Sequence, residues 1–174
     1  LDITDLSDVE NTIKKINPDI IINCAAYTDV DGSERNKNQA HMVNVVGLQN
    51  LILASNYSTY FVHISSDYVF DGNAGPYSEA DPTYPINYYG KTKLEAENTL
   101  RGSRRKFLIL RTNVLYCEDL FFKSNFFAWV YKSLVNNKTI SVVNDQISNP
   151  TYVAHLVEVI FLCIILNTEG IYHY

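Results

Sequence analysis

Short apolar runs rich in β-branched residues alternate along this chain with segments whose apolar residues recur at helical spacing. The runs at 19–26, 60–65 and 107–111 are typical of strands buried on both faces. Between them, residues 34–54 and 88–100 carry apolar side chains three or four positions apart, as a helix with one buried face requires. This order predicts an α/β fold, a Rossmann-like doubly wound parallel sheet with right-handed crossovers.

The segments after about residue 113 extend the pattern and are predicted to form a small C-terminal substrate lobe. We expect helices over 121–136 and 152–166 and a short strand over 139–143. A further helix over 6–16, with Asp5 or Ser7 as its cap, precedes the first strand. Because no low-complexity linker separates these parts, residues 1–174 are predicted to be a single Rossmann-like domain fragment, incomplete at its N-terminus.

Composition narrows the classes of partner. The net charge of −5 and the pI near 5.3 argue against binding to nucleic acid. The three cysteines lie far apart, without metal-ligand or disulfide spacing, which favours a cytoplasmic protein and predicts no metal site. The most apolar stretch, residues 157–166, is too short for a membrane span, so no membrane association is expected.

Polar residues directly after the buried strands are the first candidates for a site, because ligands of open parallel sheets bind beyond the carboxyl ends of the strands. Ser66 follows the second strand, and the helix after it begins with Tyr89 and Lys93, four residues apart and therefore on one face. Reduction of a carbonyl needs a proton donor, and an adjacent ammonium is expected to lower the pKa of a tyrosine phenol toward neutral pH. A nearby hydroxyl would hydrogen-bond the carbonyl oxygen as negative charge develops. The alternative is a chance spacing, because the chain has 13 tyrosines.

Seven motifs, in order along nearly the whole chain, resemble the dTDP-4-dehydrorhamnose reductase family of the extended short-chain dehydrogenase/reductase superfamily. They are LDITD (1–5), PDIIINCAAYTDVD (18–31), VNVVGLQNL (43–51), HISSDYVFDG (63–72), PYSEADPTYPINYYGKTKLEAE (76–97), LRTNVLY (110–116) and DQISNPTY (145–152). The resemblance implies an NAD(P)-binding domain, NADPH or NADH as cofactor, and a nucleotide-sugar substrate. A homodimer is compatible with the resemblance.

The resemblance also implies roles for individual residues. Ser66 would orient the keto oxygen, Tyr89 would donate the proton, and Lys93 would tune Tyr89 and bind the nicotinamide ribose. The other residues implied at the cofactor are Asp2, Ile3, Cys24, Ala25, Ala26 and Tyr27, and those implied at the substrate are Ser66, Asp67, Tyr68 and Asn113. Asn44 is similar to a helix asparagine that supports the lysine through water. The alternatives are structural: Asp2 as a helix cap, Tyr27 and Tyr68 as packing aromatics, and Asn44 as a packing amide.

The chain departs from the family's pattern at two places. None of its seven glycines forms the glycine-rich turn that holds a pyrophosphate at a helix N-terminus, so this segment alone is expected to bind a dinucleotide poorly. We attribute the gap to truncation or disorder. Val114 stands where these reductases usually carry a tryptophan of the substrate pocket, which weakens the assignment of the sugar more than that of the reaction.

Three functions are therefore weighed. The first is reduction of the C4 keto group of a nucleotide-linked deoxysugar, foremost dTDP-4-dehydrorhamnose to dTDP-rhamnose, for polysaccharide biosynthesis. The second is a regulatory subunit of the same fold, like the β subunit of methionine adenosyltransferase. The third is a nucleotide-sugar epimerase or dehydratase. Dehydratases place an Asp-Glu pair after the hydroxyl residue, whereas this chain has Asp67 and Tyr68, so reduction is preferred.

Overall fold

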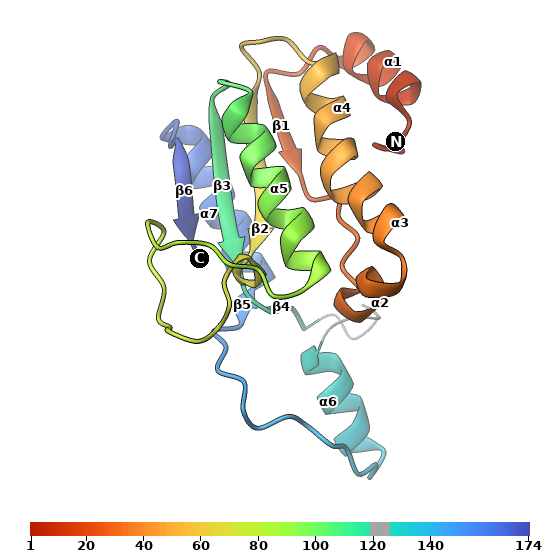
Figure 1. Ribbon diagram of the computed structural model, residues 1–174, viewed down its shortest axis with the longest axis vertical. Helices are drawn as coiled ribbons and strands as arrows, with labels where there is room; N and C mark the ends of the chain where they lie inside the picture. Colours follow the sequence, from red (N-terminus) through yellow and green to blue (C-terminus); the bar gives the residue numbers. More distant parts are fainter. Residues whose placement is uncertain (119–125) are drawn as a thin grey trace. The chain divides into compact units, whose positions relative to one another are not determined.

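A computed structural model describes residues 1–118 and 126–174 as two compact units (Figure 1). The first unit comprises Leu1–Arg111 and Glu169–His173, and the second comprises Thr112–Thr168 with Tyr174. Part of the expected helix over 121–136, residues 121–125, lies outside the described residues. Among the described residues, no helix is both long and apolar enough to cross a bilayer.

The first unit is built on a four-stranded sheet in the order β1-β2-β3-β6. The strands are β1 (Ile20–Asn23), β2 (Tyr60–Ser66), β3 (Phe107–Thr112) and β6 (Gly170–His173). β1 pairs with β2 and β3 with β6 in parallel, with Ile22 opposite Val62 and Ile109 opposite Ile171. The sequence-based prediction of an α/β fold with a parallel sheet is confirmed, although the first strand ends at Asn23 rather than at residue 26.

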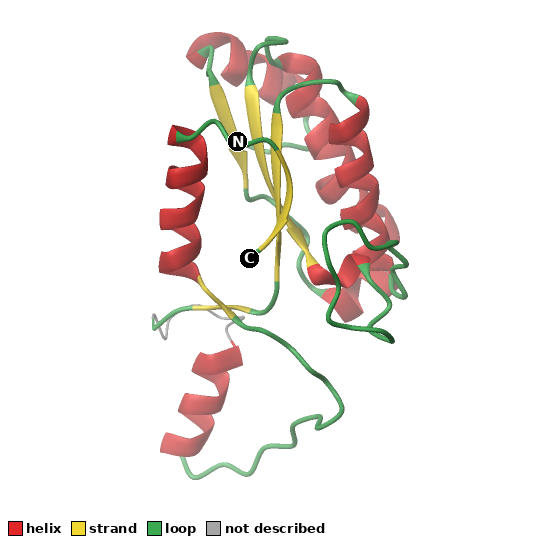
Figure 2. Ribbon diagram, turned by 90° about the vertical axis from the view of Figure 1, so that its left-hand side faces the viewer, coloured by secondary structure: helices red, strands yellow, loops and turns green. Residues whose placement is uncertain are grey.

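Helices of the first unit lie along this sheet, where Figures 1 and 2 show α4 and α5 on one face. Their bounds are α1 (Leu6–Ile16), α2 (Val30–Arg35), α3 (Lys37–His41), the π-helical turn η1 (Met42–Val46), α4 (Gly47–Ala54), the 3₁₀ turn η2 (Asp67–Val69) and α5 (Tyr88–Gly102). Asp5 caps α1 by accepting hydrogen bonds from the amides of Ser7 and Asp8. The single helix expected over 34–54 begins later, because Asn36 is non-helical and separates α2 from α3. From Lys37 to Ala54 the helix is continuous through α3, η1 and α4, and the spacing of its apolar residues did not reveal the π-helical turn within it.

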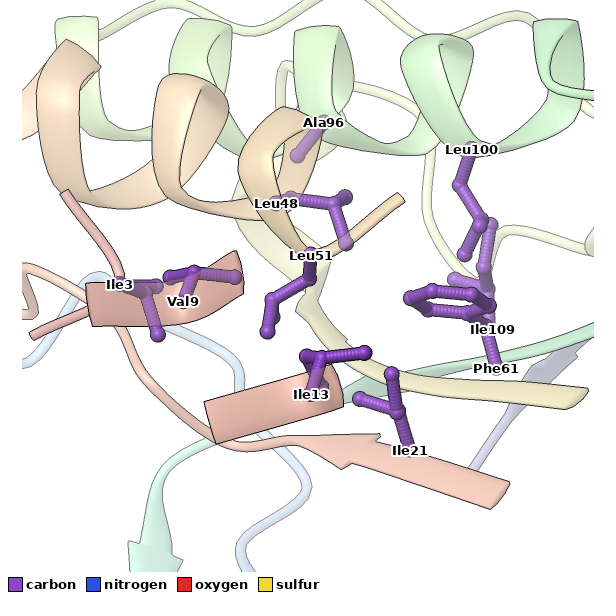
Figure 3. Close-up of a cluster of buried hydrophobic side chains, with 10 residues drawn as sticks. All are labelled: Ile3, Val9, Ile13, Ile21, Leu48, Leu51, Phe61, Ala96, Leu100 and Ile109. Carbon is purple, nitrogen blue, oxygen red and sulfur yellow. The ribbon is translucent and has the colours of Figure 1, made fainter. Parts of the chain in front are cut away.

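Ten buried side chains pack α1, α4 and α5 against the sheet (Figure 3). They are Ile3, Val9, Ile13, Ile21, Leu48, Leu51, Phe61, Ala96, Leu100 and Ile109. Full burial of a large apolar side chain contributes roughly 1.5–3 kcal/mol. The core therefore fixes α5 against β2 and β3, and with it the polar residues at the start of that helix.

The described residues of the second unit, 112–118 and 126–168 with Tyr174, form a two-stranded parallel sheet and two helices. Its elements are β4 (Leu115–Tyr116), α6 (Phe126–Val135), β5 (Thr151–Tyr152) and α7 (Val153–Ile165), and β4 pairs with β5. The strand expected over 139–143 is wrong, because those residues form no regular element. Their β-branched side chains give a local preference, but a strand also needs a partner for its backbone.

Candidate active site

The carboxyl end of β2 places a serine hydroxyl at the edge of the sheet. Ser66 is the last residue of β2, and its Oγ accepts a hydrogen bond from the Tyr68 amide at 3.2 Å. The same oxygen donates to Oδ1 of Asp67 at 3.0 Å. Burial raises the pKa of the Asp67 carboxyl above its usual value, while the bond from Ser66 opposes that rise. The Ser66 proton is thus directed at a half-buried carboxylate.

Tyr89 meets this serine from the first turn of α5. The helix begins here because the Asn87 side chain accepts from the Gly90 amide at 2.7 Å. Tyr89 is 9% exposed, and its phenol lies near enough to the Ser66 side chain for that group to influence the phenol's pKa. Its ring lies edge-to-face with that of Tyr68, with 5.6 Å between the centroids. The structure therefore brings Ser66, Tyr68 and Tyr89 close together.

A glycine makes this approach feasible. A Cβ added at Gly90 would lie 2.1 Å from the Tyr68 carbonyl oxygen and 3.0 Å from Cβ of Pro85. Any larger residue would push the first turn of α5 away from the loop after β2. The glycine in Tyr-Gly-Lys thus sets the distance between the phenol and the strand that carries Ser66.

Lys93 follows one helical turn after Tyr89 and points into the protein. It is 2% exposed, and its Nζ donates to the Ile64 carbonyl of β2 at 2.6 Å. Burial lowers the pKa of Lys93 to about 8, and the Glu97 carboxylate opposes this shift. Burial also raises the pKa of the nearby Cys24 thiol, which the charge of Lys93 opposes.

The sign expected for the Tyr89 pKa is wrong. Burial raises the pKa of Tyr89 to about 12, and the Ser66 side chain offsets only part of that rise. The sequence suggested a lowering by the neighbouring ammonium. In the structure the Lys93 amine instead bonds the Ile64 carbonyl, and the cost of burying a phenolate prevails.

The segment after β1, residues 24–27, forms one wall of the candidate site, and the start of α5 forms the other. Cys24 and Ala25 are exposed, whereas Ala26 and Tyr27 are partly buried. The Asn23 side chain accepts from the Ala25 amide at 3.1 Å and so shapes the turn. Two of the residues predicted to face the cofactor, Cys24 and Ala25, are therefore accessible.

Asn44, at the centre of the π-helical turn, ties this wall to α5. Its Oδ1 accepts from the Tyr27 amide at 2.7 Å, and its Nδ2 donates to the Thr92 hydroxyl at 2.8 Å. Thr92 directly precedes Lys93. Asn44 is 2% exposed, and its two direct hydrogen bonds link the segment after β1 to α5. π-helical turns of this kind are frequent at functional sites.

Asp2 and Ile3, which the resemblance implies at the cofactor, differ in their surroundings. Asp2 is exposed and accepts from the amide and hydroxyl of Thr4 at 2.9 and 2.8 Å. It does not cap α1, since Asp5 does. Ile3 packs in the core, and its carbonyl accepts from Asn50 at 2.9 Å.

Four buried polar residues lie below the strand ends, and the sequence reasoning assigned none of them to the site; His63 was expected to be a core histidine with satisfied hydrogen bonds. Asn23 bonds Nδ1 of His63 at 3.2 Å, and within the described residues the His63 Nε2 has no hydrogen-bond partner. Glu97 and Arg111 form a buried ion pair, with 2.7 Å between Oε2 and Nη2. The spacing of Tyr89, Lys93 and Glu97, four residues apart each, was the one signal that could have revealed Glu97.

Asn113 and Val114 belong to the second unit. The Asn113 carbonyl accepts from the Thr151 amide at 3.0 Å, between β4 and β5. Val114 has a φ of 28°, which is strained for a β-branched residue. Together with Tyr116, Phe126, Phe127, Val130 and Pro150, it lines an apolar cavity of about 380 Å³.

Comparison with known proteins places this arrangement in a family. The model of the RmlD substrate binding domain family matches residues 1–174. The chain is 38% identical to dTDP-4-dehydrorhamnose reductase of Aggregatibacter actinomycetemcomitans, over 100% of this chain and 61% of that protein. It matches a crystal structure of dTDP-4-dehydrorhamnose reductase from Bacillus anthracis in complex with NADP, with 39% identity and a TM-score of 0.93, over 100% of this chain and 62% of that one.

A more distant likeness extends to another enzyme class. UDP-glucose 4-epimerase of Thermus thermophilus, in complex with NAD, gives a TM-score of 0.84 at 20% identity, over 99% of this chain and 61% of that one, which shows a shared fold alone. The chain spans about three fifths of the length of each of these proteins. The match over all 174 residues confirms the resemblance drawn from the motifs: the chain belongs to the RmlD substrate binding domain family.

Proposed function

We propose that this chain is the catalytic part of a reductase that uses NADPH or NADH to reduce the C4 keto group of a nucleotide-linked deoxysugar, foremost dTDP-4-dehydrorhamnose. The observation that carries the proposal is the meeting of the Ser66 hydroxyl and the buried Tyr89 phenol, with Lys93 one turn below. The similar enzymes from Aggregatibacter actinomycetemcomitans and Bacillus anthracis carry the name of this reaction. We further propose a cytoplasmic location, and that the second unit, with its apolar cavity, contributes to a substrate lobe.

The residues suit a nicotinamide and a ketone. A phenol, a hydroxyl and an ammonium lie at or below the carboxyl end of β2, and Cys24 and Ala25 are exposed beside them in the segment after β1. When bound, the nicotinamide supplies the hydride. We expect Cys24 to Tyr27, Asp2 and Ile3 to line its site, and Ser66, Asp67, Tyr68 and Asn113 to contact the sugar. NADPH is proposed first, because the Bacillus anthracis structure contains NADP.

Tyr89 is suited to give a proton in this reaction. With a pKa of about 12, the phenol stays protonated throughout the physiological range. An alkoxide is a stronger base than a phenolate, so transfer from the Tyr89 oxygen to the reduced oxygen is favourable even at this pKa. Ser66 would turn its hydroxyl from Asp67 toward the keto oxygen as negative charge develops there, and Lys93 would bind the nicotinamide ribose.

A spectrophotometric assay of the full-length protein tests the proposal. dTDP-4-keto-6-deoxysugar is supplied with NADPH or NADH, and the parent is compared with Tyr89→Phe. We expect turnover by the parent and a loss of at least ~100-fold in the variant, the usual scale for removing a positioned acid. Equal rates would refute the role of Tyr89. A folded but inactive parent would favour a regulatory subunit that binds a partner enzyme.

A further inference from the structure

The carboxylate of Glu97 lies at the centre of a buried network under the proposed active site. Glu97 has no exposed surface and stands one turn after Lys93 on α5. Its Oε1 accepts from Nε of Arg111 at 2.9 Å, and its Oε2 accepts from Nη2 at 2.7 Å. The Ser65 hydroxyl, directly before Ser66, donates to Oε1 at 2.6 Å. Both carboxylate oxygens are therefore fixed.

Arg111 connects this network to the rest of the sheet. It lies on β3 with 5% of its surface exposed. Its guanidinium stands over the Phe70 ring, 5.1 Å from the centroid, and its Nη1 lies 3.4 Å from Nε2 of His173 on β6. Through Ser65, Arg111 and His173, this network joins α5 to strands β2, β3 and β6.

A contribution to stability does not by itself explain why the chain buries the Glu97–Arg111 ion pair. Removing two charges from water costs several kcal/mol per ion, and apolar replacements of buried pairs are often neutral or stabilising. The buried ammonium of Lys93 gives a better reason, because a lone charge at that depth would lose its proton.

Glu97 is the group suited to keep Lys93 charged. The Cys24 thiol faces Lys93 from the segment after β1, and burial raises its pKa, so it stays neutral. His63 faces it from β2, and burial holds the pKa of this imidazole well below 6.5, so it is neutral as well. Tyr89, on the same helix, is a neutral phenol at a pKa of about 12. The Asp67 carboxylate is engaged by Ser66.

We propose that Glu97 is a positioning residue for Lys93: its carboxylate, held by Arg111 and Ser65, keeps the Lys93 amine charged and within reach of the Ile64 carbonyl. Its importance for turnover rests on the proposed function, whereas the effect on Lys93 does not. Arg111 partly neutralises Glu97, so the two residues act on Lys93 with opposite signs.

Two variants that break the same ion pair separate this role from a structural one. Glu97→Gln removes the negative charge at nearly constant volume, and Arg111→Met removes the positive one. The pKa of Lys93 is read from the NMR titration of lysine labelled with ¹³C at Cε, assigned with Lys93→Met in the full-length protein. We expect the pKa to fall by about one unit or more in Glu97→Gln and to rise in Arg111→Met. The upper limb of the pH–rate profile is expected to shift in the same directions.

An unchanged or raised Lys93 pKa in Glu97→Gln would overturn the proposal. If either single variant fails to fold, the double variant Glu97→Met/Arg111→Met replaces the pair with apolar side chains of similar length. The Lys93 pKa is then expected to fall, and an unchanged value counts against the role of Glu97. Opposite shifts in a protein that turns over no keto sugar would leave the positioning role intact and refute the proposed reaction.

Discussion

Replacement of Gly90 by alanine tests the close approach between α5 and the loop after β2. The added Cβ would lie 2.1 Å from the Tyr68 carbonyl oxygen, whereas real Cβ contacts essentially never fall below 3.0 Å, so one side must move by about 0.9 Å. Pro85 blocks part of the retreat, because its Cβ lies 3.0 Å away. Overpacking of this kind costs about 1–3 kcal/mol, while alanine gains about 1 kcal/mol over glycine in a helix. We expect a net loss of about 0–2 kcal/mol in the free energy of unfolding.

The effect on turnover is expected to be larger than the effect on stability. Gly90 adjoins Tyr89, and a misplacement near 1 Å can cost about 100-fold in rate. Urea unfolding and initial rates are measured for Gly90→Ala beside Gly102→Ala, at the other end of α5, where an added Cβ meets nothing within 4 Å. The control is expected to keep its rate and to gain up to about 1 kcal/mol. A Gly90→Ala protein that gains stability like the control and keeps the parental rate would show the reasoning to be wrong.

Two further substitutions test the buried polar groups around the site. Asn44→Ala leaves the Tyr27 amide and the Thr92 hydroxyl without their partner, so we expect urea unfolding to show a loss of about 1–3 kcal/mol; a loss below about 0.5 kcal/mol would contradict the link between the two walls. His63 is buried neutral with its pKa held well below 6.5, so below pH 6.5 the unfolded chain binds a proton that the folded chain does not, and stability is lost as the pH falls. This loss amounts to up to about 1.4 kcal/mol per pH unit, and unfolding measured between pH 7 and pH 5 should show a shallower decline in His63→Gln than in the parent; equal declines would exclude His63 as the source.

Local patterns in the sequence were enough to predict much of the fold and part of the candidate site. The alternation of buried runs with helical spacing predicted α1, α5 and three of the four strands of the larger sheet, β1, β2 and β3, because such patterns are set by neighbouring residues. The same helical period placed Tyr89 and Lys93 on one face, and strand ends indicated Ser66. The π-helical turn within the helix over 37–54 left no such trace in the sequence. The β-branched residues at 139–143 gave a strand signal, but the structure offers them no pairing partner.

By itself, the sequence determined which chemical groups stand after which elements: a hydroxyl after β2, and a phenol and an amine one turn apart on α5. Only the tertiary structure decided how those groups are charged. Burial reversed the sign expected for the pKa of Tyr89, and Glu97 found its partner Arg111 on another element. The physical reason is that desolvation and ion pairing depend on what the folded chain places around a group, and residues distant in sequence supply those surroundings.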